Sequence, residues 1–148
     1  MKRQLIALAL LGLASTPLWA ANCATTIEGT DSMQFNKSSI VVPASCKTFT
    51  VTLKHTGTMA ANVMGHDWVL AKKSDEQGIL ADGVAAGLAK DYLKPGDKRV
   101  IAHTKIIGAG QTASVTFKVA PLKQGGPYEY FCSFPGHATL MHGTLTVK

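Results

Sequence analysis

Apolar and polar residues alternate over long stretches of this chain, which is the pattern of strands that bury one face. The alternation is clearest over residues 48–55, and it recurs over residues 114–119 and 144–147. The side chains that these three segments direct inward are Phe49, Val51, Leu53, His55, Val115, Phe117, Val119, Leu145 and Val147. We therefore expect these residues in the core of a β-rich fold.

Further short strands are expected over residues 27–42, 66–70 and 99–107, which are bounded by Gly, Pro, Asn and Asp. Several short strands at this spacing predict an all-β fold, either a sandwich or a barrel. Residues 74–93 depart from the alternation. We expect them to form a short inserted helix capped by Ser74, although three glycines weaken this pattern.

The first 20 residues have the organisation of a secretory signal peptide, with a basic start, an apolar run and a small residue, Ala20, at the expected cleavage point. No segment of the chain approaches the roughly 20 apolar residues that a membrane helix needs. Cys23 is not expected to carry a lipid, because Asn22 rather than a small residue precedes it. We expect an exported protein without membrane insertion, in which residues 21–148 form a single domain.

The charge of this domain argues against a nucleic-acid partner. Loss of Lys2 and Arg3 with the signal peptide leaves 13 basic and nine acidic residues. The basic excess is scattered in short pairs, without the basic runs and interleaved aromatic residues that follow a phosphate backbone. We interpret these charges as solvated surface.

The chain contains three cysteines, and two cysteines in an oxidising compartment tend to form a disulfide. Cys23 and Cys46 lie at the ends of strand-like segments in the first third of the domain, whereas Cys132 lies beside a histidine and a methionine. We therefore expect a Cys23–Cys46 disulfide and a free Cys132. Metal coordination would protect such a free thiol, and a buried, inert cysteine is the alternative.

Residues 130–143, YFCSFPGHATLMHG, place Cys132, His137 and Met141 in one short loop. Two nitrogens and one sulfur in a plane, with a weak axial thioether, describe a mononuclear blue-copper site. The loop supplies one such nitrogen, so a second histidine must come from elsewhere. His66 is the best candidate, because it follows Gly65 and opens an expected strand.

The other three histidines have weaker claims to a metal. His55 shares its strand face with core residues, so we expect a core histidine. His103 lies in the middle of an expected strand without a ligand neighbour. His142 follows Met141 directly and should point to the opposite face.

Two motifs, NVMGHDW at residues 62–68 and CSFPGHATLM at residues 132–141, resemble those of the azurin family of small blue copper proteins. The likeness extends through residues 46–51, 91–105 and 114–119, which covers nearly the whole predicted domain. The spacing of cysteine and histidine in the loop separates this family from plastocyanin and pseudoazurin. The resemblance implies an eight-stranded Greek-key sandwich of the cupredoxin type.

The resemblance also implies one copper ion held in plane by His66, Cys132 and His137. Met141 and the backbone carbonyl of Gly65 would be weak axial ligands. The function implied is that of a soluble periplasmic protein that cycles copper between Cu(II) and Cu(I) and shuttles electrons between redox proteins. We expect a monomer that is not an enzyme.

Other functions fit the residues less well. A nucleophile pair of Cys132 and His137 lacks an orienting third group, and a multicopper oxidase would need histidines beside the cysteine. A binuclear copper centre would need a second cysteine in the loop. A copper chaperone or storage protein stays open, because thiolate and thioether also bind Cu(I), and such a site also accepts zinc.

We expect electrons to enter and leave near His137, because the loop residues 134–136 are apolar. They are expected to form an exposed rim with Met33, Met59 and Met64, and exposed apolar patches mark contact sites. The alternative is that these methionines fill the core.

Asp67 departs from the asparagine that the azurin resemblance implies after the histidine ligand. An ionised carboxylate only accepts hydrogen bonds, whereas an amide also donates them. We therefore expect a looser link between the His66 segment and the cysteine loop, and a lower reduction potential. The alternative is a side chain that turns outward or pairs with a lysine.

Overall fold

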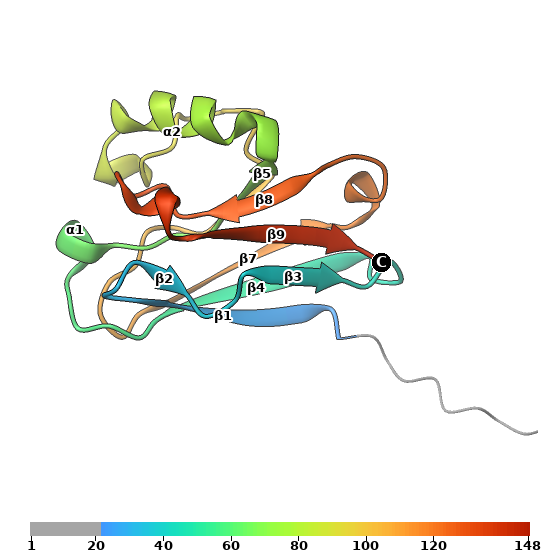
Figure 1. The fold of residues 1–148 in the computed structure, drawn as a ribbon, viewed down its shortest axis with the longest axis horizontal. Coiled ribbons are helices and arrows are strands. Elements are labelled where there is room, and N and C mark those ends of the chain that lie inside the picture. The colour runs from blue at the N-terminus through green and yellow to red at the C-terminus, as the bar shows by residue number, and fades with distance from the viewer. Residues whose placement is uncertain (1–21) are drawn as a thin grey trace, which may run out of the picture.

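The computed structural model describes residues 22–148, and the predicted signal peptide lies outside this range. Within this range, nine strands form two sheets that pack face to face, visible as two layers in Figure 1. The strands are β1 (Ala24–Thr30), β2 (Gln34–Phe35), β3 (Ser39–Val42), β4 (Thr48–His55), β5 (Val69–Lys72), β6 (Ala102–His103), β7 (Thr112–Lys118), β8 (Tyr128–Phe131) and β9 (His142–Val147). The predicted β-sandwich is confirmed, with nine strands rather than eight.

The two sheets have the strand orders β2-β1-β4-β7 and β3-β9-β8-β5-β6. The pairs β1–β4 and β3–β9 are parallel, and the other pairs are antiparallel. Neighbours in a sheet are therefore often distant in the sequence. This arrangement brings the loop between β8 and β9 to the same end of the molecule as the segment before β5 (Figure 1).

The main core lies between the two sheets. β4 directs Phe49, Val51, Leu53 and His55 into it, as the alternation predicts. The other predicted core residues also pack against this core, where Phe117, Val119 and Leu145 are buried and Val115 and Val147 are partly buried. The alternation of apolar and polar residues therefore predicts which residues lie in the core when one face of a strand is exposed to solvent.

The extent of several predicted strands differs from the structure. Residues 27–42 contribute to three strands, the strand expected over 66–70 begins only at Val69, and residues 99–107 contribute the two-residue β6. β8 was not predicted. All four of its residues are buried, because the main core covers one face and a helix covers the other, so its sequence shows no alternation.

A helix, α2 (Glu76–Val84), covers the outer face of the five-stranded sheet (Figure 1). Its Ile79 packs in a second, smaller core with Val69 and Phe131. The predicted helical insertion is therefore present, flanked by the 3₁₀ turns η1 (Lys73–Asp75) and η2 (Leu88–Lys90). The predicted cap is wrong, because Ser74 lies inside η1 and Asp75 is the residue before α2, without a side-chain cap hydrogen bond.

Three further short helical segments were not predicted. They are α1 (Ala61–Met64), η3 (Ala120–Leu122) and η4 (His137–Thr139). One or two turns are too short to give a periodic pattern in the sequence.

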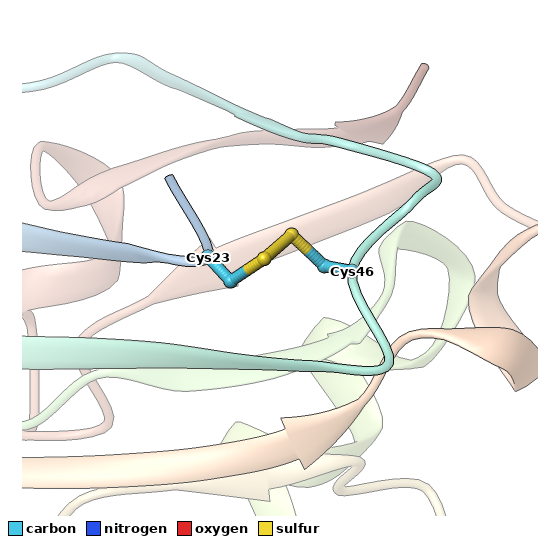
Figure 2. The surroundings of a disulfide bond; sticks show 2 residues. All are labelled: Cys23 and Cys46. Atoms are coloured by element: carbon cyan, nitrogen blue, oxygen red, sulfur yellow. A yellow bond between two sulfur atoms is a disulfide. The ribbon is translucent and has the colours of Figure 1, made fainter. Parts of the chain in front are cut away.

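The predicted disulfide between Cys23 and Cys46 is present (Figure 2). It joins the residue before β1 to the loop before β4, and Cys46 contributes to the main core. As expected, Cys132 is the free cysteine of the described residues, and it is buried. Within residues 22–148, no helix has the length and apolar character needed to cross a membrane.

Candidate metal centre

Two segments that are distant in the sequence supply the donor atoms of the candidate site. The link between α1 and β5 contains His66, whose backbone is paired with Ile107 through hydrogen bonds of 3.0 and 2.9 Å. The loop between β8 and β9 contains Cys132 at its start and His137 in η4. The Cys132 N–H donates to the Met141 carbonyl at 3.0 Å, which closes this loop at its base.

His66, Cys132 and His137 are brought together as the sequence predicts. Their ligand atoms all lie within 4.8 Å of one another, and all three residues are buried. Cys132 Sγ lies 4.0 Å from His66 Nδ1 and 3.7 Å from His137 Nδ1. At zinc-like bond lengths of about 2.3 Å to sulfur and 2.1 Å to nitrogen, a sulfur and a nitrogen on one ion lie at most about 4.4 Å apart, so both sulfur–nitrogen distances suit a single metal ion.

Both imidazoles are uncharged, which is the form in which a histidine binds a metal. His66 Nε2 lies 2.9 Å from the Thr30 carbonyl, which only accepts, so Nε2 carries the proton and Nδ1 keeps its lone pair. Burial lowers the pKa of His66. Burial, and then the nearby His66, lower the pKa of His137 to about 4, so both rings are uncharged at neutral pH.

Cys132 is held as a neutral thiol in the metal-free protein. Burial, followed by the charge of Asp67, raises its pKa well above the ordinary value. Backbone hydrogen bonds from Asp67 and Phe134 act in the opposite direction, because they stabilise the thiolate. A metal cation would supply the positive charge that this buried thiolate lacks.

Met141 and Gly65 also lie at this centre. Met141 is fully buried, and the Gly65 carbonyl oxygen lies 3.9 Å from Cys132 Sγ. A Cβ on Gly29 would lie 2.9 Å from His66 Cδ2 and 3.3 Å from Met141 Cε, so both side chains approach the same glycine of β1. Sequence reasoning missed Gly29, although a glycine inside a strand is a signal of close approach.

The remaining histidines lie as predicted. His55 is buried and stacks on His66 with ring centroids 4.6 Å apart, and its Nε2 lies 2.8 Å from the Met64 carbonyl. His103 is exposed and bonds its neighbour's carbonyl. His142 points away from the candidate centre, toward Glu129 at 2.7 Å.

Comparison with known proteins indicates which metal suits this candidate centre. The copper-binding plastocyanin/azurin family matches residues 21–148. The chain belongs to this family. It is 58% identical to azurin of Pseudomonas aeruginosa over all 148 residues of both chains. It is also 56% identical to azurin of Bordetella pertussis over 144 residues, which is 97% of this chain and 96% of that one.

The donor set suits the metal of the plastocyanin/azurin family. One sulfur and two imidazole nitrogens, buried and already oriented, match the preference of copper for soft and borderline ligands. Copper is therefore the cofactor that family membership and geometry both support.

Asp67 is where this family member departs from the expected asparagine. Its carboxylate is fully buried and accepts a hydrogen bond from the Ser133 N–H at 2.7 Å. It therefore ties the His66 segment to the cysteine loop, and neither turns outward nor pairs with a lysine. Ser133 supplies the hydrogen-bond donors for this link, and the expectation that it is looser than with asparagine stays a prediction.

The Ser133 hydroxyl contacts two oxygens, Asp67 Oδ2 at 2.6 Å and the Asp91 carbonyl at 2.7 Å. A hydroxyl has one proton and can donate to only one of them at a time. A protonated Asp67 would complete both contacts. Burial raises the pKa of Asp67 to about 7, against the opposing hydrogen bonds from Ser133.

Proposed function

We propose that residues 21–148 form a single blue-copper domain that transfers electrons. His66, Cys132 and His137 would hold the copper ion, with Met141 and the Gly65 carbonyl as weaker ligands. One observation carries the proposal: a buried thiol and two neutral imidazoles converge within 4.8 Å in a member of a copper-binding family.

Bound copper supplies a one-electron couple between Cu(II) and Cu(I). The protein contributes a centre that changes little between the two states, because its ligands are fixed before the metal binds. The Thr30 carbonyl orients the His66 ring. The backbone hydrogen bond from the Cys132 N–H to the Met141 carbonyl closes the loop. Preorganised ligands lower the barrier to electron transfer by reducing the rearrangement that it requires.

The same burial argues against an enzyme. A nucleophilic cysteine must be accessible and ionised, whereas Cys132 is fully buried and its pKa is raised by burial. His137, which would act as the base, lies in the same enclosed centre and is only 4% exposed. We therefore propose an electron carrier without catalysis of its own.

We propose that redox proteins dock at the apolar rim around His137. Met33 and Met64 are partly exposed and Met59 is 42% exposed, which argues against the alternative that they fill the core. Val63 and Leu140, exposed by 59% and 55%, extend the apolar surface. α1 and η4 lie at the same end of the sandwich (Figure 1), so one partner surface can cover both.

We further propose that the protein acts as a monomer in the periplasm after cleavage following Ala20, without nucleic-acid binding or membrane insertion. The support is the signal-peptide pattern of residues 1–20 and the Cys23–Cys46 disulfide, a bond that persists in oxidising compartments.

Voltammetry combined with a metal-transfer assay separates this function from copper storage or delivery. We expect reversible one-electron cycling, with copper retained when a Cu(I) chelator is added to the reduced protein. Rapid transfer of copper to the chelator without reversible cycling would support a chaperone and contradict the proposal.

A further inference from the structure

Two consecutive residues between η2 and β6, Asp91 and Tyr92, have left-handed backbone conformations, with φ angles of 55° and 48°. Aspartate tolerates this conformation, but it is unfavourable for a bulky residue such as tyrosine. Such strain persists only where the surrounding structure holds it, and it is found most often at functional sites. The contacts of this Asp91–Tyr92 turn therefore indicate what the strain maintains.

Neighbouring elements fix the backbone of the Asp91–Tyr92 turn. The Tyr92 N–H donates to the Gly87 carbonyl at 3.0 Å. Asp91 Oδ1 accepts from the Ile106 N–H at 2.7 Å. Gly83 of α2 packs so closely on the Tyr92 carbonyl that a Cβ at this glycine would overlap it. The turn is therefore held between α2 and the segment that follows β6.

The Asp91–Tyr92 turn contacts two successive residues of the loop that follows Cys132. The Asp91 carbonyl lies 2.7 Å from the Ser133 hydroxyl. The Tyr92 ring meets the Phe134 ring edge to face, with centroids 5.4 Å apart and planes at 73°, which is a favourable geometry for an aromatic pair. In the described part of the chain the Tyr92 hydroxyl makes no hydrogen bond, so its contact with the loop depends on the ring.

Phe134 in turn packs on His137, one of the proposed copper ligands. Their ring centroids are 4.5 Å apart, and the planes are tilted by 31°. The Phe134 carbonyl also accepts from the His137 N–H at 3.0 Å, so the ring and the backbone of one residue both set the position of the imidazole. Because Phe134 is partly exposed, its ring can shift toward solvent when a neighbour is removed.

We propose that Tyr92 is a positioning residue of the copper centre, because its ring holds Phe134 against His137. The inference rests on the proposed role of His137 as a copper ligand. A ligand that is locked by packing needs less rearrangement when the metal changes its oxidation state. The strained turn serves this purpose, because it directs the Tyr92 ring at the loop.

Hydrogen exchange of the His137 amide in the metal-free protein tests this series of contacts without copper. We expect Tyr92→Leu to speed the exchange about tenfold, because a released Phe134 holds its carbonyl less firmly. Tyr92→Phe should leave the exchange rate unchanged, because it keeps the ring. Tyr128→Leu is the matched control, because Tyr128 packs in the main core at the start of β8. An unchanged rate in Tyr92→Leu, or an equal increase in Tyr92→Phe or Tyr128→Leu, would overturn the proposal.

The copper form distinguishes positioning from a contribution to stability alone. We expect Tyr92→Leu to shift both the reduction potential and the visible band, and Tyr92→Phe to restore the wild-type values. Adding Tyr92→Leu to Phe134→Leu should cause little further shift, because Tyr92 acts through Phe134.

Two results would contradict this inference alone: a blue Tyr92→Leu protein with the potential and band of the wild type, or shifts that add fully in the double variant. A wild type without a blue band would instead contradict the proposed function.

Discussion

Single residues determined how far the copper centre could be predicted. Cys132, His137 and Met141 were found because their chemistry is rare and their spacing is short. Gly29, Thr30 and Ser133 were not found, because they act through contacts between segments distant in the sequence. Residue type reveals a ligand, whereas the groups that orient it depend on the fold.

Asp67 gives the first prediction at this scale. We expect Asp67→Asn to raise the reduction potential above pH 7 and to have little effect well below it. The raised pKa of about 7 means that the wild-type carboxyl is ionised only on the alkaline side, where its charge favours Cu(II). An amide keeps both contacts to Ser133 without the charge. Voltammetry of the variant and the wild type across this pH range measures the difference in reduction potential. An equal potential of the two proteins at alkaline pH would contradict the reasoning.

At the scale of elements, predictions from the sequence succeeded where burial is one-sided. β4 and β9 alternate and were predicted, although β9 begins at His142 rather than at residue 144, whereas β8 is covered on both faces and was missed. The predicted helical insertion is present, but the residue at which its helix begins was predicted incorrectly. The N-terminus of α2 is set by packing of Ile79 against the sheet rather than by a cap at Ser74.

The disulfide links two elements and gives the second prediction. Replacing both Cys23 and Cys46 by serine should lower the free energy of unfolding by about 3 kcal/mol, because a closed loop of this length restricts the unfolded chain. Denaturant unfolding of the metal-free protein measures the change. The blue colour of the copper form should persist, and an unchanged stability would argue against this account.

A surface ion-pair network joins α2 to the loop before β6 and gives the third prediction. Arg99 contacts Asp82 and Asp97, each at 2.6 Å. Hydrogen bonds from Arg99 lower the pKa of Asp97 to about 2, from 3.8. Asp97 therefore contributes stability above about pH 4 that is lost as the pH falls toward 2.

Asp97→Asn should accordingly make the loss of stability between pH 4 and pH 2 shallower. Acid unfolding followed by circular dichroism measures this slope. Asp75→Asn is the control, because Asp75 has no ion pair among residues 22–148. Equal slopes in wild type and Asp97→Asn would be evidence against the linkage.

At the scale of the whole molecule, the segments that carry Met33, Met59 and Met64 lie at the same end of the sandwich as the candidate copper ligands (Figure 1). The fourth prediction is that Met64→Lys slows electron exchange with redox partners, because a charge in the rim must be desolvated on docking. Val41→Lys, which adds a lysine at a 55% exposed valine of β3, is the matched control. Stopped-flow kinetics should show slower electron exchange in Met64→Lys but not in Val41→Lys. Equal rates of exchange in Met64→Lys and the wild type would exclude this rim as the docking site.

The central claim is that Cys132, with His66 and His137, binds copper. The visible absorption spectrum of the Cu(II) protein tests it most directly, because a short copper–thiolate bond gives intense charge-transfer absorption. We predict a strong blue band in the wild type that is absent in Cys132→Ser. An intense visible band that persists in Cys132→Ser, or is missing from the copper-loaded wild type, would contradict the account.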